Sequence, residues 1–255
     1  MKPYTKLIFI LAGAFLCLTG LSFFNDINIF GYEPAKMEFA FEATASETPA
    51  PAATTPVKPA APKPKVFDNS PKTILFIGDS MLEGLSRRLG AYGDKNGHKV
   101  YTVIWYASST ERWGTSPRLK KYITQYKPDI VFVCLGGNEL FIADIKKKRT
   151  KYVQKIVSDI GNIPYIWIGP PNWKEDTGIN DMIKGVVGDE RFFLSKNLKF
   201  ERAKDGCHPT WKSAYKWMDQ VIAWYKTSSN PQFKLDTPSI ESKAPTKTIV
   251  HKPNE

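Results

Sequence analysis

The chain has 255 residues, of which 42% are hydrophobic and 24% are charged, enough for one mid-sized domain with extensions. Its net charge of +11 suggests nucleic-acid binding, but the lysines are scattered and no zinc-finger spacing or RNP-like sequence is present, so a solvated basic face is expected, with attraction to acidic glycans or membranes as the alternative. The absence of these motifs predicts no nucleic-acid partner. The three cysteines share no metal-type spacing, so no metal site is expected, and the sequence indicates no cofactor.

Residues 1–24 are the first predicted element, a signal anchor that spans the membrane. Lys2 and Lys6 precede an uncharged run from Leu7 to Phe24, which is just long enough to cross a bilayer. The basic flank favours an orientation with the remainder of the chain outside the cytoplasm. A cleaved signal peptide is the alternative, although bulky residues stand where a signal peptidase needs small ones. Both interpretations predict an extracytoplasmic domain, periplasmic or at the cell surface, and the first tethers it to the cell membrane.

Two polar regions flank the predicted domain. Residues 25–65 form a juxtamembrane segment and a Pro/Ala-rich linker, with prolines at 49, 51, 56, 59, 62 and 64. Because proline fixes φ and lacks a backbone donor, this linker is expected to be a semi-rigid spacer. Residues 228–255 are expected to be a disordered tail, which leaves residues 66–227 as the globular domain.

Within residues 66–227, apolar strand-like runs alternate with helix-like segments. This alternation predicts an α/β domain with a parallel sheet covered by helices on both faces. In chain order the predicted elements are a strand at 73–77, a helix at 81–93, a strand at 100–105, a helix at 119–126, a strand at 130–135, a helix at 151–160, a strand at 165–168, a helix at 179–187, a strand at 191–194 and a helix at 209–226.

Polar residues follow four of these strands, and the carboxyl ends of parallel strands are where sites form. We therefore expect one edge of the sheet to gather Gly78-Asp79-Ser80, Tyr106-Ala107-Ser108-Ser109, Gly136-Gly137-Asn138-Glu139 and Gly169-Pro170-Pro171-Asn172-Trp173. The chain has three histidines. His98 is predicted at the opposite end of the sheet and His251 in the tail, which leaves His208 as the one that can reach this edge.

These residue types at this edge predict nucleophilic catalysis. Ser80 stands in a strand-to-helix turn, and its hydroxyl needs a base such as His208, which in turn needs an orienting acceptor such as Asp205. The Ser80 N–H, the Asn138 side-chain amide and a backbone N–H near Ser108 are the expected donors to an oxyanion. Each signal has an ordinary alternative, since a Gly-Asp-Ser turn is often an N-cap and an Asn after two glycines is often a turn residue.

Three of these segments, in this order, resemble conserved blocks of the SGNH hydrolases, the GDSL-type esterases and lipases. They are Gly78-Asp79-Ser80 for block I, Gly136-Gly137-Asn138-Glu139 for block III and Asp205-Gly206-Cys207-His208 for block V. The resemblance implies a flavodoxin-like three-layer α/β/α sandwich with a five-stranded parallel sheet. It also implies a triad of Ser80, Asp205 and His208, and an oxyanion hole of the Ser80 N–H, Asn138 and a block II residue.

The sequence departs from the family pattern at two places. Block II normally centres on a glycine, whereas here the second strand is followed by Tyr106-Ala107-Ser108-Ser109-Thr110, so the residue that supplies its N–H is left open. Block III usually ends in aspartate, and Glu139 stands there instead. The second change is expected to leave the chemistry intact.

The sequence predicts a serine esterase of the cell envelope that hydrolyses an O-acyl ester, expected to be O-acetyl, on a glycan through an acyl-enzyme on Ser80. An O-acyltransferase with the same triad and a non-catalytic glycan-binding module are the alternatives. Trp173, Asp79 and Gly137 are expected to contact the substrate, with Trp173 stacking on a sugar ring unless it serves ordinary packing. A disulfide between Cys134 and Cys207 is compatible with an oxidising compartment.

Overall fold

The computed structural model describes residues 68–228 and 233–254. The predicted anchor at 1–24 and the predicted linker at 25–65 lie outside these residues. In the two described ranges, no helix combines the length and the apolar character that crossing a bilayer requires.

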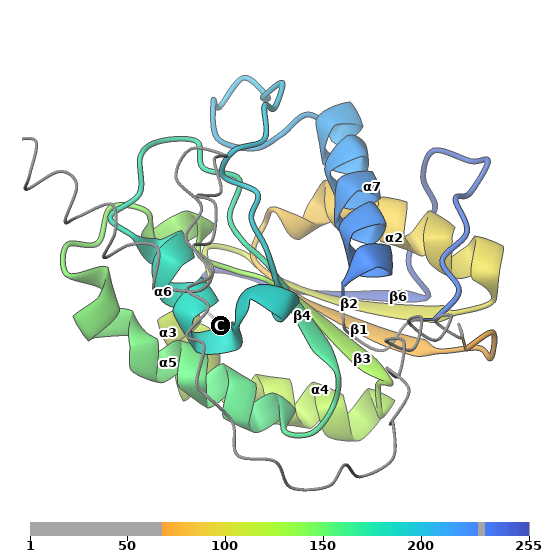
Figure 1. Cartoon of the computed structure of the whole chain (residues 1–255), viewed down its shortest axis with the longest axis horizontal. Helices are drawn as coiled ribbons and strands as arrows, with labels where there is room; N and C mark the ends of the chain where they lie inside the picture. Colours follow the sequence, from red (N-terminus) through yellow and green to blue (C-terminus); the bar gives the residue numbers. More distant parts are fainter. Residues whose placement is uncertain (1–67, 229–232, 255) are drawn as a thin grey trace, which may run out of the picture. The chain divides into compact units, whose positions relative to one another are not determined.

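A parallel sheet of six strands, in the order β5-β4-β3-β1-β2-β6, forms the middle layer of the domain (Figure 1). Every neighbouring pair of strands is parallel. Five of the strands have the flavodoxin-like order 2-1-3-4-5, which confirms the predicted fold class; the sixth was not predicted. The strands are β1 (Thr73–Gly78), β2 (Lys99–Trp105), β3 (Ile130–Cys134), β4 (Tyr165–Ile168), β5 (Phe192–Phe193) and β6 (Lys247–His251).

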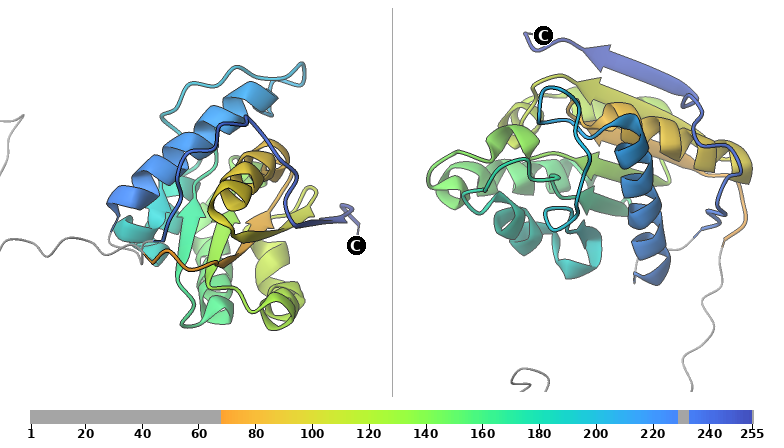
Figure 2. Two further views of the ribbon diagram at one scale, coloured as in Figure 1. Left: turned by 90° about the vertical axis from the view of Figure 1, so that its right-hand side faces the viewer. Right: turned by 90° about the horizontal axis from the view of Figure 1, so that it is seen from above.

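Helices cover both faces of the sheet (Figures 1 and 2). One face carries α2 (Leu82–Asn96) and α7 (Trp211–Thr227). The other face carries α3 (Thr110–Thr115), α4 (Arg118–Tyr126), α5 (Ile145–Ile160) and α6 (Ile179–Val187). Two short 3-10 turns, η1 (Gly137–Glu139) and η2 (Asp189–Arg191), follow β3 and precede β5.

Strand β1 shows why the central strands are apolar throughout. Its side chains alternate between the faces, so that Ile74 and Phe76 pack with α2 and α7 while Leu75 and Ile77 pack with the helices opposite. All four side chains are fully buried. Burial of each contributes about 1.5–3 kcal/mol, so both faces of β1 stabilise the sheet and hold its carboxyl end in place.

The prediction of a disordered tail at 228–255 is wrong for residues 233–254. Phe233 and Leu235 are buried in the core beside α7, and β6 pairs with β2 along the edge of the sheet (Figure 2). Between them the chain runs along α2, where Arg88 Nη1 donates to the Ile240 and Glu241 carbonyls. These main-chain contacts and two buried side chains order a segment whose composition is polar.

The two cysteines of the domain are free thiols, so the disulfide considered from the sequence is not formed. Cys134 is buried at the end of β3, and burial raises the pKa of its thiol well above the usual range. Cys207 lies in the loop before α7 with partial exposure.

Candidate active site

Ser80 is placed by the close approach of β1 and β3. A side chain at Gly78 would bring its Cβ within 2.2 Å of the Cys134 carbonyl oxygen, so only glycine fits at the end of β1. The chain then turns into α2, where the Leu82 N–H donates to the Asp79 carbonyl (3.1 Å) and the Glu83 N–H to the Ser80 carbonyl (3.2 Å). Ser80 is therefore held, partly exposed, at the carboxyl edge of the sheet.

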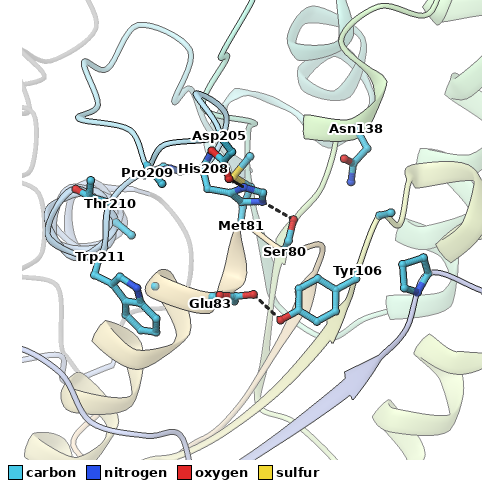
Figure 3. A pocket seen from close by; sticks show the side chains of 15 residues that line it. Ser80, Met81, Glu83, Tyr106, Asn138, Asp205, His208, Pro209, Thr210 and Trp211 are labelled. Atoms are coloured by element: carbon cyan, nitrogen blue, oxygen red, sulfur yellow. Dashed lines mark hydrogen bonds and ion pairs between the residues drawn. The ribbon is translucent and has the colours of Figure 1, made fainter.

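The structure brings Ser80, His208 and Asp205 into one hydrogen-bonded chain (Figure 3). Ser80 Oγ lies 2.8 Å from His208 Nε2, and His208 Nδ1 lies 2.8 Å from Asp205 Oδ2. The second carboxylate oxygen, Oδ1, accepts the N–H groups of Cys207 (2.8 Å) and His208 (3.0 Å). The Cys207 N–H, then the two His208 donors, lower the pKa of Asp205 to about 2. An ionised Asp205 accepts from Nδ1, which leaves Nε2 free to accept the serine proton.

Arg202, which the motifs did not identify, fixes the loop that carries His208. Its guanidinium donates to the Cys207 carbonyl within the loop. It also donates to the carbonyls of Pro171 (2.9 Å) and Asn172 (2.8 Å), in the segment that follows β4. The loop is closed on itself by the Ala203 N–H, which donates to the His208 carbonyl (2.8 Å). An arginine in a loop carries no sequence signal for this role, because its partners are backbone carbonyls.

Ser108, predicted near the block II donor, does not line the cavity, whereas its neighbour Ala107 does. Ser108 is fully buried, its N–H donates to the Trp105 carbonyl (3.1 Å) and its hydroxyl accepts from Trp113 Nε1 (3.0 Å). Ala107 is exposed, lines the cavity beside Ser80 and has a φ of 51°, in the left-handed region that favours glycine. Ala107 thus adopts the conformation expected of the block II glycine.

Asn138 reaches the same cavity from η1, and in Figure 3 it and His208 flank Ser80 from two sides. Its Nδ2 donates to the Ser108 carbonyl at 2.9 Å, and a second, long contact of 3.4 Å joins it to Asp79 Oδ2. The short bond fixes the amide beside the nucleophile. The N–H with the longer contact is the one that an oxyanion can recruit.

Glu139 connects the segments that follow β2 and β3. Its buried carboxylate accepts the Thr110 N–H (2.7 Å) and hydroxyl (2.9 Å) and pairs with Arg149 of α5 (2.8 Å). Burial, partly offset by these partners, raises its pKa. The Glu139 side chain thus lies behind the site, where it joins Thr110 of α3 to Arg149 of α5.

Asp79 and Gly137 do not contact the cavity, contrary to their predicted role in substrate binding. The Asp79 side chain is 1% exposed, and Oδ1 accepts the Met81 N–H at 2.9 Å. Burial raises the pKa of Asp79 to about 7, against the lowering effect of the Met81 N–H and of His208. Gly137 is buried beside Asp79 and Met81. Both residues shape the turns behind the nucleophile, and neither lines the cavity that a substrate would enter.

Trp173 also lies outside the cavity that contains Ser80. Its indole Nε1 donates to the Gly137 carbonyl (3.3 Å), and its ring meets the ring of Phe141 edge-on at 5.1 Å. It packs against both layers of the core. Trp173 therefore serves packing behind the site, the alternative that the sequence left open.

A cavity of about 710 Å³ opens beside Ser80, a volume typical of a small-molecule site. Its aromatic walls are Trp211, at the start of α7, and Tyr106, which follows β2 (Figure 3). Among residues 68–228 and 233–254, no three His, Cys, Asp or Glu side chains are grouped as metal ligands would be. The described residues that line the cavity are Ser80, Met81, Glu83, Gly84, Tyr106, Ala107, Asn138, Ala203, Asp205, His208, Pro209, Thr210, Trp211, Ala214 and Pro253.

Comparison with known proteins finds similarity only among solved structures. No protein-family model matches the chain, and no curated protein sequence matches it. The psychrotrophic esterase EstA from Pseudoalteromonas sp. is 17% identical with a TM-score of 0.45, over 61% of this chain and 97% of that one. A protein of the G-D-S-L family from Desulfitobacterium hafniense DCB-2 is 13% identical with a TM-score of 0.43, over 60% and 99%. The Clostridium thermocellum family 3 carbohydrate esterase is 16% identical with a TM-score of 0.43, over 63% and 100%.

Such identities do not carry a reaction or a substrate from one protein to another, so the chemistry of this site is argued from its own geometry.

Proposed function

We propose that the chain is a serine hydrolase of ester bonds, with Ser80 as the nucleophile and His208 as its general base. The observation that carries this proposal is the pair of 2.8 Å contacts that align a hydroxyl, an imidazole and a carboxylate at the mouth of a cavity. A glycan-binding module has no need of this alignment. A low Asp205 pKa keeps the imidazole oriented throughout the neutral pH range.

In the reaction, Ser80 Oγ attacks the ester carbonyl carbon while its proton passes to His208 Nε2. The tetrahedral oxyanion accepts hydrogen bonds from the Ser80 N–H, the Ala107 N–H and the Asn138 amide, each worth about 2.7–4 kcal/mol in related chemistry. His208 then protonates the departing alkoxide, which leaves an acyl-enzyme on Ser80. Water attacks this ester with His208 again as base and releases the acid.

Water is the proposed acceptor because the triad is open to solvent. The His208 side chain is 38% exposed and that of Asp205 is 50% exposed. An enzyme that transfers its acyl group to a sugar must keep water away from the acyl-enzyme, and closure of the site is the usual means. Product analysis with and without an acceptor glycan distinguishes the two outcomes.

The proposed natural substrate is an O-acetyl group, or another small O-acyl group, on a glycan of the cell envelope. The predicted N-terminal anchor supports this location, since it would export the domain and tether it to the membrane. The volume of the cavity and its two aromatic walls support a ring-shaped substrate beside the ester.

The full-length chain with 4-nitrophenyl acetate tests the reaction. Ser80→Ala and His208→Gln are expected to lower kcat/KM by about 10⁴-fold or more, and Asp205→Asn by less, because Asp205 orients the base without touching the substrate. Ser158→Ala, at an exposed serine of α5, is the matched control and should keep full activity. Retained turnover in a Ser80→Ala protein with an unchanged Tm would refute the assignment.

A further inference from the structure

We propose that Trp211, Glu83 and Tyr106 form a subsite for an uncharged sugar ring, and that this subsite makes the enzyme select esters of neutral sugars over those of uronic acids. The inference rests on the proposed function and names its substrate class. The three residues, called the neutral-sugar subsite below, line the same cavity as Ser80 and His208.

Three elements converge to build the neutral-sugar subsite. Trp211 begins α7, Glu83 lies in the first turn of α2, and Tyr106 follows β2. The helices can approach because Gly84 of α2 faces Ala214 of α7, where an added Cβ would come within 2.4 Å of the Ala214 Cβ. Figure 3 shows the Glu83 carboxylate between the Trp211 indole and the Tyr106 ring, and it accepts a hydrogen bond from the Tyr106 hydroxyl.

Trp211 supplies the apolar platform. Its side chain is 51% exposed, whereas Trp113, Trp167 and Trp217 are fully buried. The Arg87 guanidinium lies over the Trp211 ring, 5.3 Å from its centroid, and Tyr215 meets the ring edge-on at 6.2 Å. These contacts hold the indole in one orientation while much of it stays accessible at the cavity wall. The apolar C–H face of a pyranose is the kind of surface that such a ring covers.

Glu83 and Tyr106 supply the polar wall, which accepts hydrogen bonds. The Tyr106 hydroxyl donates to Glu83 Oε1, and this bond, ahead of burial, raises the pKa of Tyr106 to about 12. Since the phenol proton is committed to Glu83, what remains for a ligand is the lone pairs of the carboxylate and of the phenol oxygen. Sugar hydroxyls can donate to these lone pairs, whereas a ligand carboxylate cannot.

The acidic lining of the cavity disfavours anionic sugars. The chain carries 36 lysines and arginines, yet none of the described residues that line the cavity is a lysine or arginine, and two, Glu83 and Asp205, are acidic. Like charges repel, so a ligand carboxylate in this cavity would be repelled by Glu83 and Asp205. The guanidinium of Arg87, which lies over one face of the Trp211 ring, disfavours a cationic ligand there and offsets part of the repulsion that Glu83 and Asp205 exert on an anionic one. An uncharged ring meets neither obstacle.

The test compares two O-acetylated oligosaccharides, one of xylose and one of galacturonic acid, with 4-nitrophenyl acetate as the small reference ester. With the full-length chain, kcat/KM is expected to be at least about tenfold higher for the acetylated xylo-oligosaccharide than for the acetylated galacturonide. Trp211→Ala should raise KM for the xylo-oligosaccharide about tenfold. The rise in KM for the aryl ester should be much smaller, because that ester is too small to reach Trp211. Glu83→Gln should raise kcat/KM for the galacturonide and narrow the preference.

Lys212→Ala is the control, since Lys212 is the exposed neighbour of Trp211 and does not line the cavity. Lys212→Ala should leave kcat/KM unchanged for both sugar substrates. The neutral-sugar subsite is overturned if the unmodified chain has equal kcat/KM for the two sugars. It is also overturned if Trp211→Ala raises KM equally for the xylo-oligosaccharide and the aryl ester.

Binding to the inactive Ser80→Ala chain, followed by titration calorimetry, separates failure of the subsite from failure of the proposed function. The acetylated xylo-oligosaccharide should bind to it and the galacturonide should not. If the unmodified chain turns over no ester but this preference in binding persists, the esterase is refuted and the subsite stands. If it hydrolyses the aryl ester but binds the two sugars alike, the subsite is refuted and the esterase stands.

Discussion

Asp79 and Ser80 are neighbours in the chain with opposite surroundings. Ser80 opens onto the cavity, while the Asp79 carboxyl is buried between the turn at Met81 and the amide of Asn138. Burial disfavours the ionised carboxylate and raises its pKa to about 7. The folded state therefore holds a proton on Asp79 at pH values where the unfolded chain, with a carboxyl pKa near 3.8, has lost it.

This difference predicts that Asp79 makes stability depend on pH. Its contribution is fully present below pH 3.8 and is lost as the pH rises through about 7, because the unfolded state binds fewer protons in that window. Asp79→Asn keeps an acceptor for the Met81 N–H but cannot ionise. The fall in Tm between pH 5 and pH 8 should therefore be smaller in this variant than in the unmodified chain.

Thermal unfolding across this pH range makes the comparison, with Asp181→Asn, at an exposed carboxylate of α6, as the control. The Tm of Asp79→Asn should still fall somewhat between pH 5 and pH 8, because burial raises the pKa of Glu139 as well. His208 faces Asp79 with the opposite effect on its pKa. Curves of Tm against pH that run parallel for the unmodified chain and Asp79→Asn would contradict this origin of the pH dependence.

The residues that act by chemical type could be identified from the sequence, and those that act by position could not. Ser80 is identifiable because it follows a strand end, and His208 because it is the one of three histidines that can reach that edge, with Asp205 three residues before it. Ala107 could have been found only by aligning it with the missing block II glycine, since its role depends on a left-handed φ. Trp211 could not be identified, because the packing of α7 determines which side of its first turn faces the cavity.

The C-terminal strand β6 connects the edge of the sheet to the site. The Tyr106 N–H donates to the His251 carbonyl (3.1 Å), and Trp105 Nε1 donates to the Lys252 carbonyl (3.2 Å). The Tyr122 hydroxyl is 2.6 Å from His251 Nε2. Beyond β6, Pro253 lines the cavity. The strand thus supports the end of β2, where Tyr106 and Ala107 leave the sheet.

Deletion of residues 246–255 is therefore expected to weaken both the fold and substrate binding. It removes the pairing of β6 with β2 and the wall at Pro253, so the Tm should fall by several degrees and KM for an acetylated oligosaccharide should rise. Thermal unfolding and steady-state kinetics measure the two effects. A chain shortened only by residues 254–255 is the control and should match the full chain. If the longer deletion matches it as well, β6 has no such role.

Two helices, α5 and α3, have boundaries that the periodicity of apolar residues did not predict. The helix predicted at 151–160 begins at Ile145, and in its added first turns the lysines are exposed while Arg149 pairs with the buried Glu139. Helix α3 was not predicted, since six residues cannot show a helical period; the Ser109 hydroxyl caps it by accepting the Arg112 N–H (3.2 Å). A contact with a distant segment, between Arg149 and Glu139, thus accompanies the early start of α5, whereas a local cap at Ser109 begins α3.

At the scale of the whole domain, burial determined what could be predicted. Strands β1, β3 and β4 are buried on both faces, and this produces continuous apolar runs that are readily identified in a sequence. Strand β6 lies at the edge with Lys247, Thr248 and Val250 exposed, so its composition is that of a tail. Once the inner strands are placed, their carboxyl ends define the location of the site. The location of the site could therefore be predicted from the sequence, whereas the residues that wall its cavity could not.

Charge is distributed unevenly over the same domain. The helix α5 presents Lys146, Lys147, Lys148 and Lys151 to solvent, while the cavity beside Ser80 contains acidic side chains and no lysine or arginine among its described lining residues. The net charge of +11 thus describes the surface and not the site. A substrate preference inferred from net charge would favour anionic ligands, the opposite of the preference that we propose from the cavity.

Covalent labelling with a serine-directed fluorophosphonate tests the nucleophile most directly. The full-length chain is incubated with the reagent, digested, and examined by mass spectrometry for the modified residue. We expect one phosphonylated serine, Ser80, with labelling lost in Ser80→Ala and strongly slowed in His208→Gln, because the imidazole must take the hydroxyl proton. A label on any other serine, or an unmodified Ser80 after prolonged exposure of the folded chain, would contradict the proposed chemistry.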